Sequence, residues 1–215
     1  MANEKTLDYW NHLYSKDDFF GTGPTKLAIL AQSLIHEKQN HSILELGCGQ
    51  GRDALFFSQI GHNVEAIDVS SNAIDFVNKT KNLLGINSLR ASVGDISKPL
   101  EFDNNSFDLV YSNLALQFFD IEQMRSIFEN ISKVLKKDSK FLFSTKKEGD
   151  KYHNFGKQIN ENAFENKGII RYFFSSNELK NLLSKDFRIL KFESDKHTNL
   201  DSTVSVWWKI LVEKK

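Results

Sequence analysis

The sequence predicts an α/β fold in which helices cover both faces of one mostly parallel, doubly wound sheet. Three observations lead to this prediction. From Ser42 onward, short apolar runs alternate with segments of amphipathic helical periodicity. No internal repeat, low-complexity tract or Pro/Gly-rich linker interrupts the alternation. The 215 residues are enough to bury one sizeable core. We therefore expect a single domain that spans residues 1–215.

The first forty residues are expected to be helical. Leu7, Trp10 and Tyr14 recur at a spacing that places them on one face of a helix. A second apolar helical pattern follows, and Pro24 suits its first position because proline has no N–H to leave unpaired. The segment Gly21–Gly23 supplies a flexible joint between the two patterns. We interpret residues 1–40 as an N-terminal helical lid.

Five apolar runs are expected to form the parallel strands of a core that spans residues 42–145. These runs are Ile43–Leu46, Val64–Ile67, Leu89–Val93, Phe107–Tyr111 and Lys140–Ser144. The helices between the first three runs are expected to end at Gly61 and Gly85, where glycine forms a C-terminal cap.

Two later helices have clear starts in the sequence. Asp120 and Gln123 have the spacing of a capping box, in which each side chain binds the other residue's backbone N–H. Ser175 and Glu178 repeat this spacing before another apolar helical pattern.

The chain is expected to end in an antiparallel pair of strands. The last two apolar runs, Phe187–Phe192 and Thr203–Val212, are separated by about ten mostly polar residues. That connection is too short for the helical crossover that parallel strands need. Residues 175–215 are therefore assigned to the last helix and a C-terminal hairpin, and residues 146–174 to an insertion on the substrate side.

Composition and charge exclude several classes of protein. Lys plus Arg and Asp plus Glu both number 28, so the formal net charge is zero. A protein that binds through phosphate contacts usually carries a basic surplus, so no nucleic-acid partner is expected. Three lysine pairs, at 136–137, 146–147 and 214–215, are interpreted as solvated ends of elements.

The sequence also bears on membrane association and on the cellular compartment. No run approaches the roughly 18 apolar residues of a membrane span, and the N-terminus lacks the pattern of a signal peptide. Cys48 is the single cysteine, which fits a reducing compartment. We expect no membrane partner, a cytoplasmic location, and a monomer or weak homodimer.

The strongest chemical signal is the segment Ile43–Gly51, where a buried strand enters a glycine-rich turn that opens a helix. Glycines let the backbone approach a ligand closely, and free N–H groups at a helix start favour an anionic group. The spacing is G-x-G-x-G, whereas the dinucleotide fingerprint is G-x-G-x-x-G. Glu45, just before the first glycine, suits a ligand ammonium group better than a pyrophosphate. Cys48 is interpreted as a packing residue, not a nucleophile.

Two further carboxylates follow strands of the predicted sheet. Asp68 ends the second strand, where a carboxylate can bind ribose hydroxyls. Ser70 or Ser71 can cap the next helix, which leaves Asp68 for a ligand, and the core is not expected to need its carboxylate. Asp95 follows the third strand, and it can bind an adenine amine or serve its own turn.

The four segments ELGCGQG, AIDVS, GDI and FDLVYSNLALQFF, in this order and spacing, resemble the class I S-adenosylmethionine-dependent methyltransferases. The resemblance covers nearly the whole chain from Ser42 onward. It implies a Rossmann-like, seven-stranded sheet of order 3-2-1-4-5-7-6 with strand 7 antiparallel, and S-adenosyl-L-methionine as cofactor. The cofactor-binding residues that it implies are Glu45, Gly47, Cys48, Gly49 and Gly51 at the methionine moiety, Asp68 at the ribose, Val69, Asp95 and Ile96 at the adenine, and Asn113 and Leu114 beside the sulfonium.

Within that family, GCGQGRDALFFSQIGHNVEAIDVS is similar to the small-molecule branch typified by tellurite- and thiopurine-type methyltransferases. Gln117 stands where that branch has the histidine of a Ser-Leu-His-Tyr-Phe segment, so no catalytic base is assigned. The expected activity is in-line transfer of a methyl group to a small molecule. The alternatives are a protein acceptor, cofactor binding without catalysis and, less favoured by the glycine spacing, a nicotinamide oxidoreductase.

Residues that contact the acceptor are expected outside the cofactor core. Trp10 and Tyr14 form an aromatic lid, or they pack on the core. Tyr152, Lys157, Arg171 and Tyr172 suit an anionic or aromatic acceptor, although the segment from 171 to 174 equally suits a strand that leads into the next helix, an interpretation that is slightly favoured. Gln117 is a further candidate on the substrate side. The six histidines show no ligand spacing, so no metal is expected.

Overall fold

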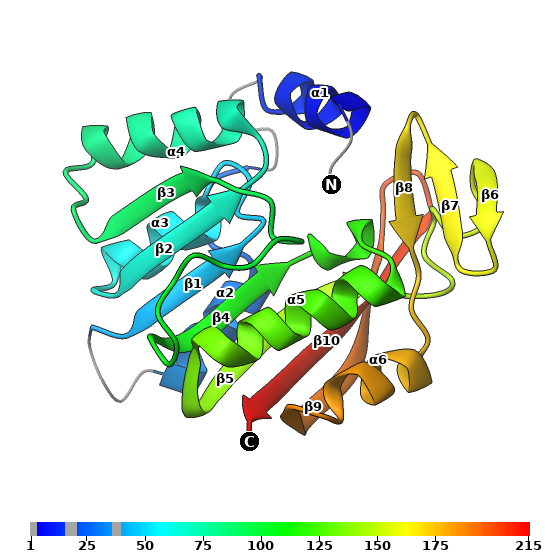
Figure 1. Cartoon of the computed structure of the whole chain (residues 1–215). Coiled ribbons are helices and arrows are strands. Elements are labelled where there is room, and N and C mark those ends of the chain that lie inside the picture. Colours follow the sequence, from blue (N-terminus) through cyan, green and yellow to red (C-terminus); the bar gives the residue numbers. More distant parts are fainter. Residues whose placement is uncertain (1–3, 16–20, 36–39) are drawn as a thin grey trace.

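The computed structural model describes residues 4–15, 21–35 and 40–215. Seven strands form one sheet in the order β3-β2-β1-β4-β5-β10-β9 (Figure 1). This order confirms the predicted one, because β10 and β9 take the places of strands 7 and 6. The strands are β1 (Ser42–Leu46), β2 (Asn63–Asp68), β3 (Leu89–Val93), β4 (Phe107–Asn113), β5 (Leu135–Lys146), β9 (Phe187–Thr198) and β10 (Val204–Lys214).

β1 occupies the middle of the parallel part of the sheet. It pairs in parallel with β2 on one side and with β4 on the other. The register places Glu45 opposite Ala66 and Tyr111, so the carboxyl ends of the three strands meet at one edge. That edge is where open α/β sheets bind ligands.

Helices cover both faces of the sheet, as the alternation of runs predicts. Successive residues of a strand point to opposite faces, so Ile43 and Leu44 enter two different cores. The first core packs the sheet against α2 (Lys26–Ile35), α3 (Arg52–Gln59) and α4 (Ser71–Leu83). The second packs it against α5 (Ile121–Val134) and α6 (Ser176–Leu183), which lie in front of the sheet in Figure 1.

Local sequence signals place the helix ends correctly. α3 and α4 end just before Gly61 and Gly85, both of which have positive φ. Complete capping boxes open α5 and α6: the Asp120 side chain accepts from the Gln123 backbone, and Ser175 does the same with Glu178. Each box satisfies two backbone N–H groups that would otherwise lack partners.

Pro24 is not the first helical residue, which corrects the sequence interpretation. α2 begins at Lys26, and the Thr25 hydroxyl accepts from the Ala28 N–H at 3.1 Å, as an N-cap residue does. The Thr25 backbone N–H is itself bound by Asp53 at 2.7 Å. This contact between distant segments fixes the start of α2 beyond the proline.

The C-terminal hairpin is longer than expected. β9 continues to Thr198, so the loop between β9 and β10 is much shorter than the ten residues predicted. The two strands pair antiparallel, with Val204 opposite Thr198, and the predicted pairing is confirmed.

The segment at residues 146–174 forms a second, three-stranded antiparallel sheet that the sequence did not predict. Its strands are β6 (Lys157–Asn160), β7 (Ala163–Asn166) and β8 (Ile169–Tyr172). The sheet stands beyond the C-terminal edge of the main sheet, across from α1 (Glu4–Leu13) in Figure 1. β8 lies beside the short 3-10 helix η1 (Leu116–Phe118).

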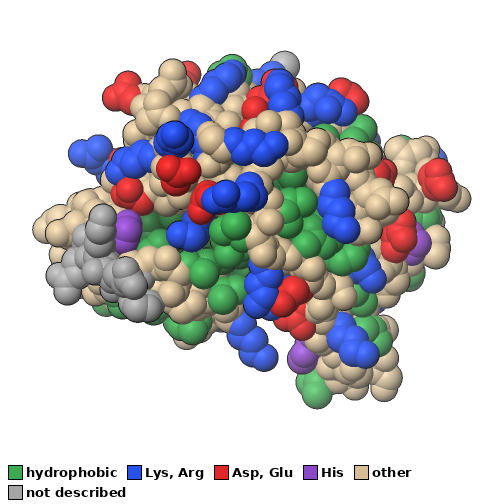
Figure 2. Space-filling model, turned by 90° about the horizontal axis from the view of Figure 1, so that it is seen from below, with side chains coloured by type: hydrophobic (Ala, Val, Ile, Leu, Met, Phe, Trp, Pro, Cys, Tyr) green, Lys and Arg blue, Asp and Glu red, His purple; other side chains and the backbone are tan. Residues whose placement is uncertain are grey.

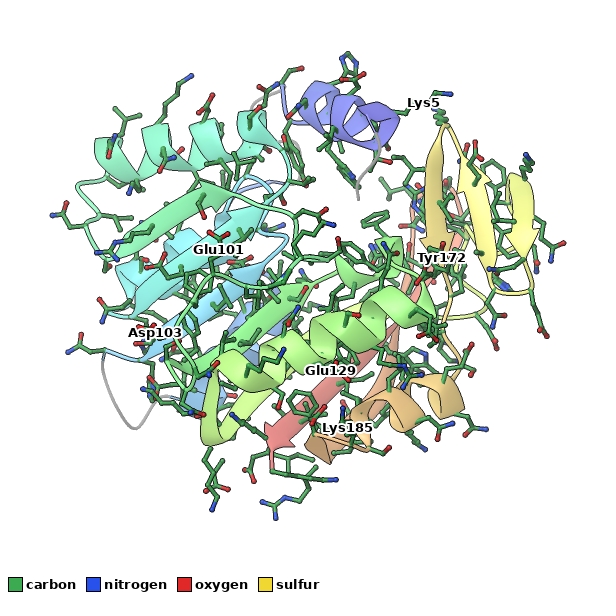
Figure 3. All side chains as sticks on the ribbon, in the orientation of Figure 1. Lys5, Glu101, Asp103, Glu129, Tyr172 and Lys185 are labelled. Carbon is green, nitrogen blue, oxygen red and sulfur yellow. The ribbon has the colours of Figure 1, made fainter. Side chains whose placement is uncertain are left out.

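Charges of both signs share the surface. Figure 2 shows Lys and Arg side chains among Asp and Glu side chains on the face seen from below. Several are paired: Glu129 of α5 binds Lys185, which follows α6, at 2.9 Å (Figure 3). Within the part of the chain that the structure describes, no helix is both long enough and apolar enough to span a membrane.

A buried histidine, His62, lies at the end of the sheet opposite the predicted ligand site. His62 is 1% exposed, its Nδ1 accepts from the His41 N–H at 3.3 Å, and its Nε2 lies 2.9 Å from the Gln32 Oε1. Burial and the neighbouring His41 lower the pKa of His62. Asp108, 3.8 Å from the His41 ring, and Lys136 are the charged groups beside this pair.

We predict that the free energy of unfolding falls as the pH is lowered from about 6.5, the pKa of histidine in an unfolded chain. Below that value the unfolded state binds a proton that folded His62 does not, so the slope is at most about 1.4 kcal/mol per pH unit. His62→Asn, which keeps an acceptor near Nδ1, should flatten this slope. Urea denaturation of both proteins at pH 7, 6 and 5 measures it. If the free energy of unfolding depends on pH with the same slope in both proteins, the pH dependence does not come from His62.

Candidate functional site

One cavity of about 960 Å³ lies at the carboxyl ends of β1, β2, β4 and β5. α1 and η1 contribute to its walls, and so do β8 and the turn that precedes α2. Every site residue proposed from the sequence lines this cavity except Gly51 and Lys157, and Lys157 is exposed on β6. The structure therefore brings together the candidate cofactor residues and the candidate acceptor residues.

The glycine loop exposes its backbone to the cavity because two of its positions have no room for a side chain. A Cβ on Gly47 would lie 2.3 Å from the Ala115 Cβ, and one on Gly49 would lie 2.7 Å from the Tyr14 hydroxyl. Both glycines also have positive φ, which other residues rarely adopt. The loop is tied to the second strand because the Gly47 and Cys48 N–H groups both donate to the Ile67 carbonyl.

Gly51 has a packing role. A Cβ there would lie 2.6 Å from a Val77 methyl group, so this glycine lets α3 approach α4. It does not line the cavity, which corrects its assignment to the ligand. Its φ of 74° also sets the turn into α3.

Glu45 has one oxygen without a partner. The residue is 3% exposed, it lines the cavity, and its Oε2 has no hydrogen bond to any residue that the structure describes. Burial and the nearby carboxylates of Asp53 and Asp68 raise the pKa of Glu45, while a backbone hydrogen bond from Ala54 lowers it. A buried acceptor beside two other carboxylates is suited to a cationic ligand group.

Asp68 supports the loop as well as lining the cavity. Its Oδ2 accepts from the Gly49 N–H at 2.8 Å, and its Oδ1 accepts from the Ser70 N–H at 2.9 Å. Ser70 is the N-cap of α4, as expected. The expectation that the core does not need this carboxylate is wrong, since Asp68 is 7% exposed and binds two loop N–H groups.

The third carboxylate, Asp95, binds its own turn. Its Oδ1 accepts from the Ser97 N–H at 2.9 Å and from the Ser97 hydroxyl at 2.6 Å. Asp95 also lines the cavity, together with Val69 and the buried Ile96. Of the two roles considered for Asp95, the structure shows the turn role.

The end of β4 holds a strained backbone at the middle of the cavity. Leu114 has a φ of 53°, an unfavourable value for a bulky side chain. Its N–H is bound by the Ser144 hydroxyl at 3.0 Å, and its carbonyl accepts from the Gln117 amide. Ser144 also donates to Asn113 at 2.6 Å. The Gln117 Oε1 is buried without a partner among the described residues.

α1 lies over the glycine loop. The Trp10 and Tyr14 rings are stacked at 5.9 Å, and Trp10 meets the ring of Phe118 edge to face at 4.9 Å. Asn11 fixes the helix to α4, because its Oδ1 accepts from the Ser70 hydroxyl at 2.7 Å. Tyr14 lies just beyond the end of α1, and burial together with Asp68 raises its pKa. Residues 1–3, 16–20 and 36–39 of the predicted lid lie outside the described residues.

The opposite wall of the cavity is formed by β8 and the segment before β6. The Arg171 guanidinium lies 4.8 Å from the centre of the Tyr152 ring and 5.6 Å from that of Phe118. Tyr172 stacks on Phe174 at 6.4 Å and lies near the start of α5 (Figure 3). Arg171 and Tyr172 belong to β8, so the strand interpretation of this segment is confirmed, and both residues also line the cavity.

Two polar groups near the site were missed from the sequence. Asp53 is 2% exposed, and it accepts from Tyr111 at 2.6 Å and from the Thr25 hydroxyl at 2.8 Å. The Asp directly after Gly51-Arg52 was visible, but its partners come from distant segments. Lys146 is buried and binds Asp150 at 2.6 Å, so interpreting it as a solvated strand end was wrong.

The described residues contain no group of three or more His, Cys, Asp and Glu side chains placed to hold a metal ion. Cys48 is buried, and burial together with Asp68 and Glu45 raises the pKa of its thiol. The thiol is therefore protonated at neutral pH, which suits packing and not nucleophilic attack.

Residues 43–138 match a family model described as a methyltransferase domain. The matched segment, which is less than half of the chain, is similar to S-adenosylmethionine-dependent methyltransferases. A probable S-adenosyl-L-methionine-dependent methyltransferase, TehB of Haemophilus influenzae, is 34% identical over 89 residues, which are 41% of this chain and 30% of that protein. The match thus spans less than a third of that relative's length.

Two further methyltransferases extend the comparison. Phosphoethanolamine N-methyltransferase of Plasmodium falciparum is 25% identical over 93% of this chain and 77% of that protein. A solved structure of the 1,6-didemethyltoxoflavin-N1-methyltransferase of Burkholderia thailandensis, with S-adenosylhomocysteine bound, superposes with a TM-score of 0.67. It is 18% identical and covers 88% of this chain and 76% of that one, so this likeness concerns the fold.

Asp68→Ala is predicted to destabilise this protein even without ligand. The change leaves the Gly49 and Ser70 N–H groups without an acceptor. Each buried N–H group that loses its partner lowers the free energy of unfolding by about 1–3 kcal/mol. Asp68→Asn, which keeps one acceptor oxygen, should lose less. The control Asp75→Ala, on the exposed side of α4, should stay within about 0.5 kcal/mol of the wild type. Denaturant unfolding measures all three, and a fully stable Asp68→Ala variant would contradict the structural role.

Proposed function

We propose that this protein transfers a methyl group from S-adenosylmethionine to a small-molecule acceptor. The observation that carries the proposal is the single cavity that joins the glycine loop to the aromatic and basic wall at β8. Its volume of about 960 Å³ lies at the upper end for ligand pockets. That space suits a cofactor and a small acceptor side by side. Two of the similar proteins are named for small acceptors, phosphoethanolamine and 1,6-didemethyltoxoflavin.

The residues at the glycine loop fit the cofactor of this family. The unpartnered Glu45 Oε2 suits the amino group of the methionine moiety, and Gly47 and Gly49 of the loop line the same cavity. We assign the ribose to Asp68, whose two oxygens can each accept more than one hydrogen bond. The adenine is assigned to Val69, Asp95 and Ile96. The cofactor supplies an activated methyl group on a sulfonium, so the protein needs no nucleophile of its own.

The chain's own contribution is to position the acceptor and exclude water. No histidine appears among the described residues that line the cavity. The buried Gln117 Oε1 can accept a hydrogen bond from the acceptor, and Gln117 also holds the strained Leu114 carbonyl. Orientation of two reactants in this way lowers the barrier by fixing their geometry before the reaction.

The α1 helix is assigned the role of a lid over both ligands. The Tyr14 hydroxyl lies against Gly49, and Trp10, which stacks on Tyr14, meets Phe118 near the acceptor wall. The hydrogen bonds from Ser70 and Asn72 to Asn11 hold the helix in this closed position. Closure of a lid excludes water from the reacting atoms.

Binding and turnover test the proposed function. S-adenosylhomocysteine should bind with micromolar affinity in calorimetry, and NAD should not bind. A panel of thiols, thiopurines, selenite and tellurite, amines and carboxylic acids should contain an acceptor whose methylation releases S-adenosylhomocysteine. Glu45→Gln should weaken cofactor binding by roughly 1.5–3 kcal/mol, as expected on losing a charge-assisted hydrogen bond. The control Glu101→Gln, at an exposed position, should bind normally.

Three results would count against this function. Tighter binding of NAD than of S-adenosylmethionine would overturn the cofactor assignment. Turnover of a protein substrate with no turnover of any small molecule would overturn the acceptor class. Normal cofactor binding by Glu45→Gln would remove the role of Glu45.

Limited proteolysis tests the lid. We predict that S-adenosylhomocysteine protects the bonds between Asn3 and Thr22 from cleavage. Asn11→Ala removes the acceptor for Ser70, so cleavage without ligand should increase. The turnover rate of this variant should fall, while its free energy of unfolding should change little. Deletion of residues 1–20 should have the same effect on turnover to a greater degree. Equal cleavage with and without ligand, and a truncated protein that fails to fold, would make α1 a structural helix.

A further inference from the structure

The two ends of the cavity carry opposite charge. Three carboxylates, Glu45, Asp53 and Asp68, line the glycine-loop end of the cavity, and the charges of Asp53 and Asp68 raise the pKa of Glu45. At the β8 end the lining contains two cations, Lys146 and Arg171. A ligand that fills the cavity is therefore expected to be cationic at one end and anionic at the other.

Lys146 is already neutralised. Its Nζ lies 2.6 Å from the Asp150 Oδ2, and the Asp150 side chain is fully buried. Asp150 also accepts from the Val206 N–H at 2.8 Å and from the Tyr152 N–H at 3.1 Å. Burial lowers the pKa of Lys146, Asp150 raises it, and the positive charges of Lys151 and Arg171 lower it further. The pair thus fixes the wall, and it leaves no carboxylate for Arg171.

Arg171 has no ion-pair partner within the part of the chain that the structure describes. The rings of Tyr152 and Phe118 lie 4.8 and 5.6 Å from it and hold it by cation–π contacts. A guanidinium carries five N–H donors that can also bind a carboxylate or a phosphate.

We propose that the methyl acceptor carries an oxyanion, a carboxylate or a phosphate, and that Arg171 binds this group. The inference rests on the proposed function, because it names the class of acceptor for the same cavity. Arg171 is half-buried, and a half-buried cation gains most from an anion that meets its fork of N–H donors. Phe118, which also contacts Trp10 of the lid, then links anion binding to the closed position of α1.

The competing explanation is structural, with Arg171 serving only to hold β8 against Tyr152 and Phe118. Arg171→Met separates the two roles because methionine keeps an apolar stem that packs on both rings and removes the charge. Arg171→Lys keeps the charge and loses the planar fork. The matched control is Lys157→Met, which removes an exposed cation from β6 of the same small sheet.

The test uses the full chain saturated with S-adenosylhomocysteine and three pairs of probes that differ in charge. The pairs are 4-hydroxybenzoate with 4-hydroxybenzamide, 3-mercaptopropionate with 3-mercaptopropionamide, and phosphoethanolamine with ethanolamine. Calorimetry or ligand-observed NMR gives the affinity of each probe. Inorganic phosphate, titrated alone and as a competitor, separates recognition of a free oxyanion from recognition of one carried by an organic acceptor.

We expect at least one anionic probe to bind the wild type ten times more tightly than its neutral partner. Arg171→Met should remove this preference, Arg171→Lys should keep part of it, and Lys157→Met should leave it unchanged. Affinity for S-adenosylhomocysteine should stay within threefold in every variant, which also shows that each variant is folded. Added phosphate should compete with the anionic probes.

Two outcomes would overturn the inference. One is that no anionic probe binds more tightly than its neutral partner, including the case in which no probe binds. The other is a preference that survives in Arg171→Met. Either result with normal S-adenosylhomocysteine binding rejects the oxyanion alone, whereas failure of the wild type to bind S-adenosylhomocysteine rejects the proposed function itself.

Discussion

The carboxylate of Asp68 joins three parts of the molecule that are far apart in the sequence. Through the Gly49 N–H it holds the glycine loop, and through the Ser70 N–H it holds the turn into α4. Ser70 then binds Asn11 of α1, so the same turn also positions α1. The loop needs this acceptor because its sharp turn leaves backbone N–H groups without partners in a buried place. The cofactor end of the cavity depends on this arrangement.

A continuous series of ring contacts runs along the cavity from the glycine loop to the small sheet. The Tyr14 hydroxyl lies over Gly49, Tyr14 stacks on Trp10, Trp10 meets Phe118, and Phe118 contacts Arg171. Two elements outside the main sheet, α1 and β8, therefore meet through side chains above its carboxyl edge. Rings are rigid and bury large areas, so a shift of α1 on one side of the cavity can displace β8 on the other side through these contacts.

The sequence by itself determined the main sheet, most of the helix ends and most of the residues that meet at the glycine-loop end of the cavity. Strand runs, capping boxes such as Asp120 with Gln123, and the glycine spacing are local signals, and each depends on neighbours within a few residues. Glu45 and Asp68 followed from the same logic, because parallel strands bring their carboxyl ends to one edge. These features could be predicted because short-range chemistry fixes them.

Tertiary structure alone decided the rest. Gly51 has the spacing of a ligand residue, yet the approach of Val77 on α4 makes it a packing position. From the sequence Lys146 was interpreted as a solvated strand end, yet it is buried and pairs with Asp150. Asp150 is itself held by the Val206 N–H of β10. The small sheet has short strands, and all of β6 is exposed, so it lacks the apolar alternation that marks a strand in a sequence. In each case the structural role of the residue or strand depends on contacts with segments far away in the sequence. A local sequence pattern does not contain that information.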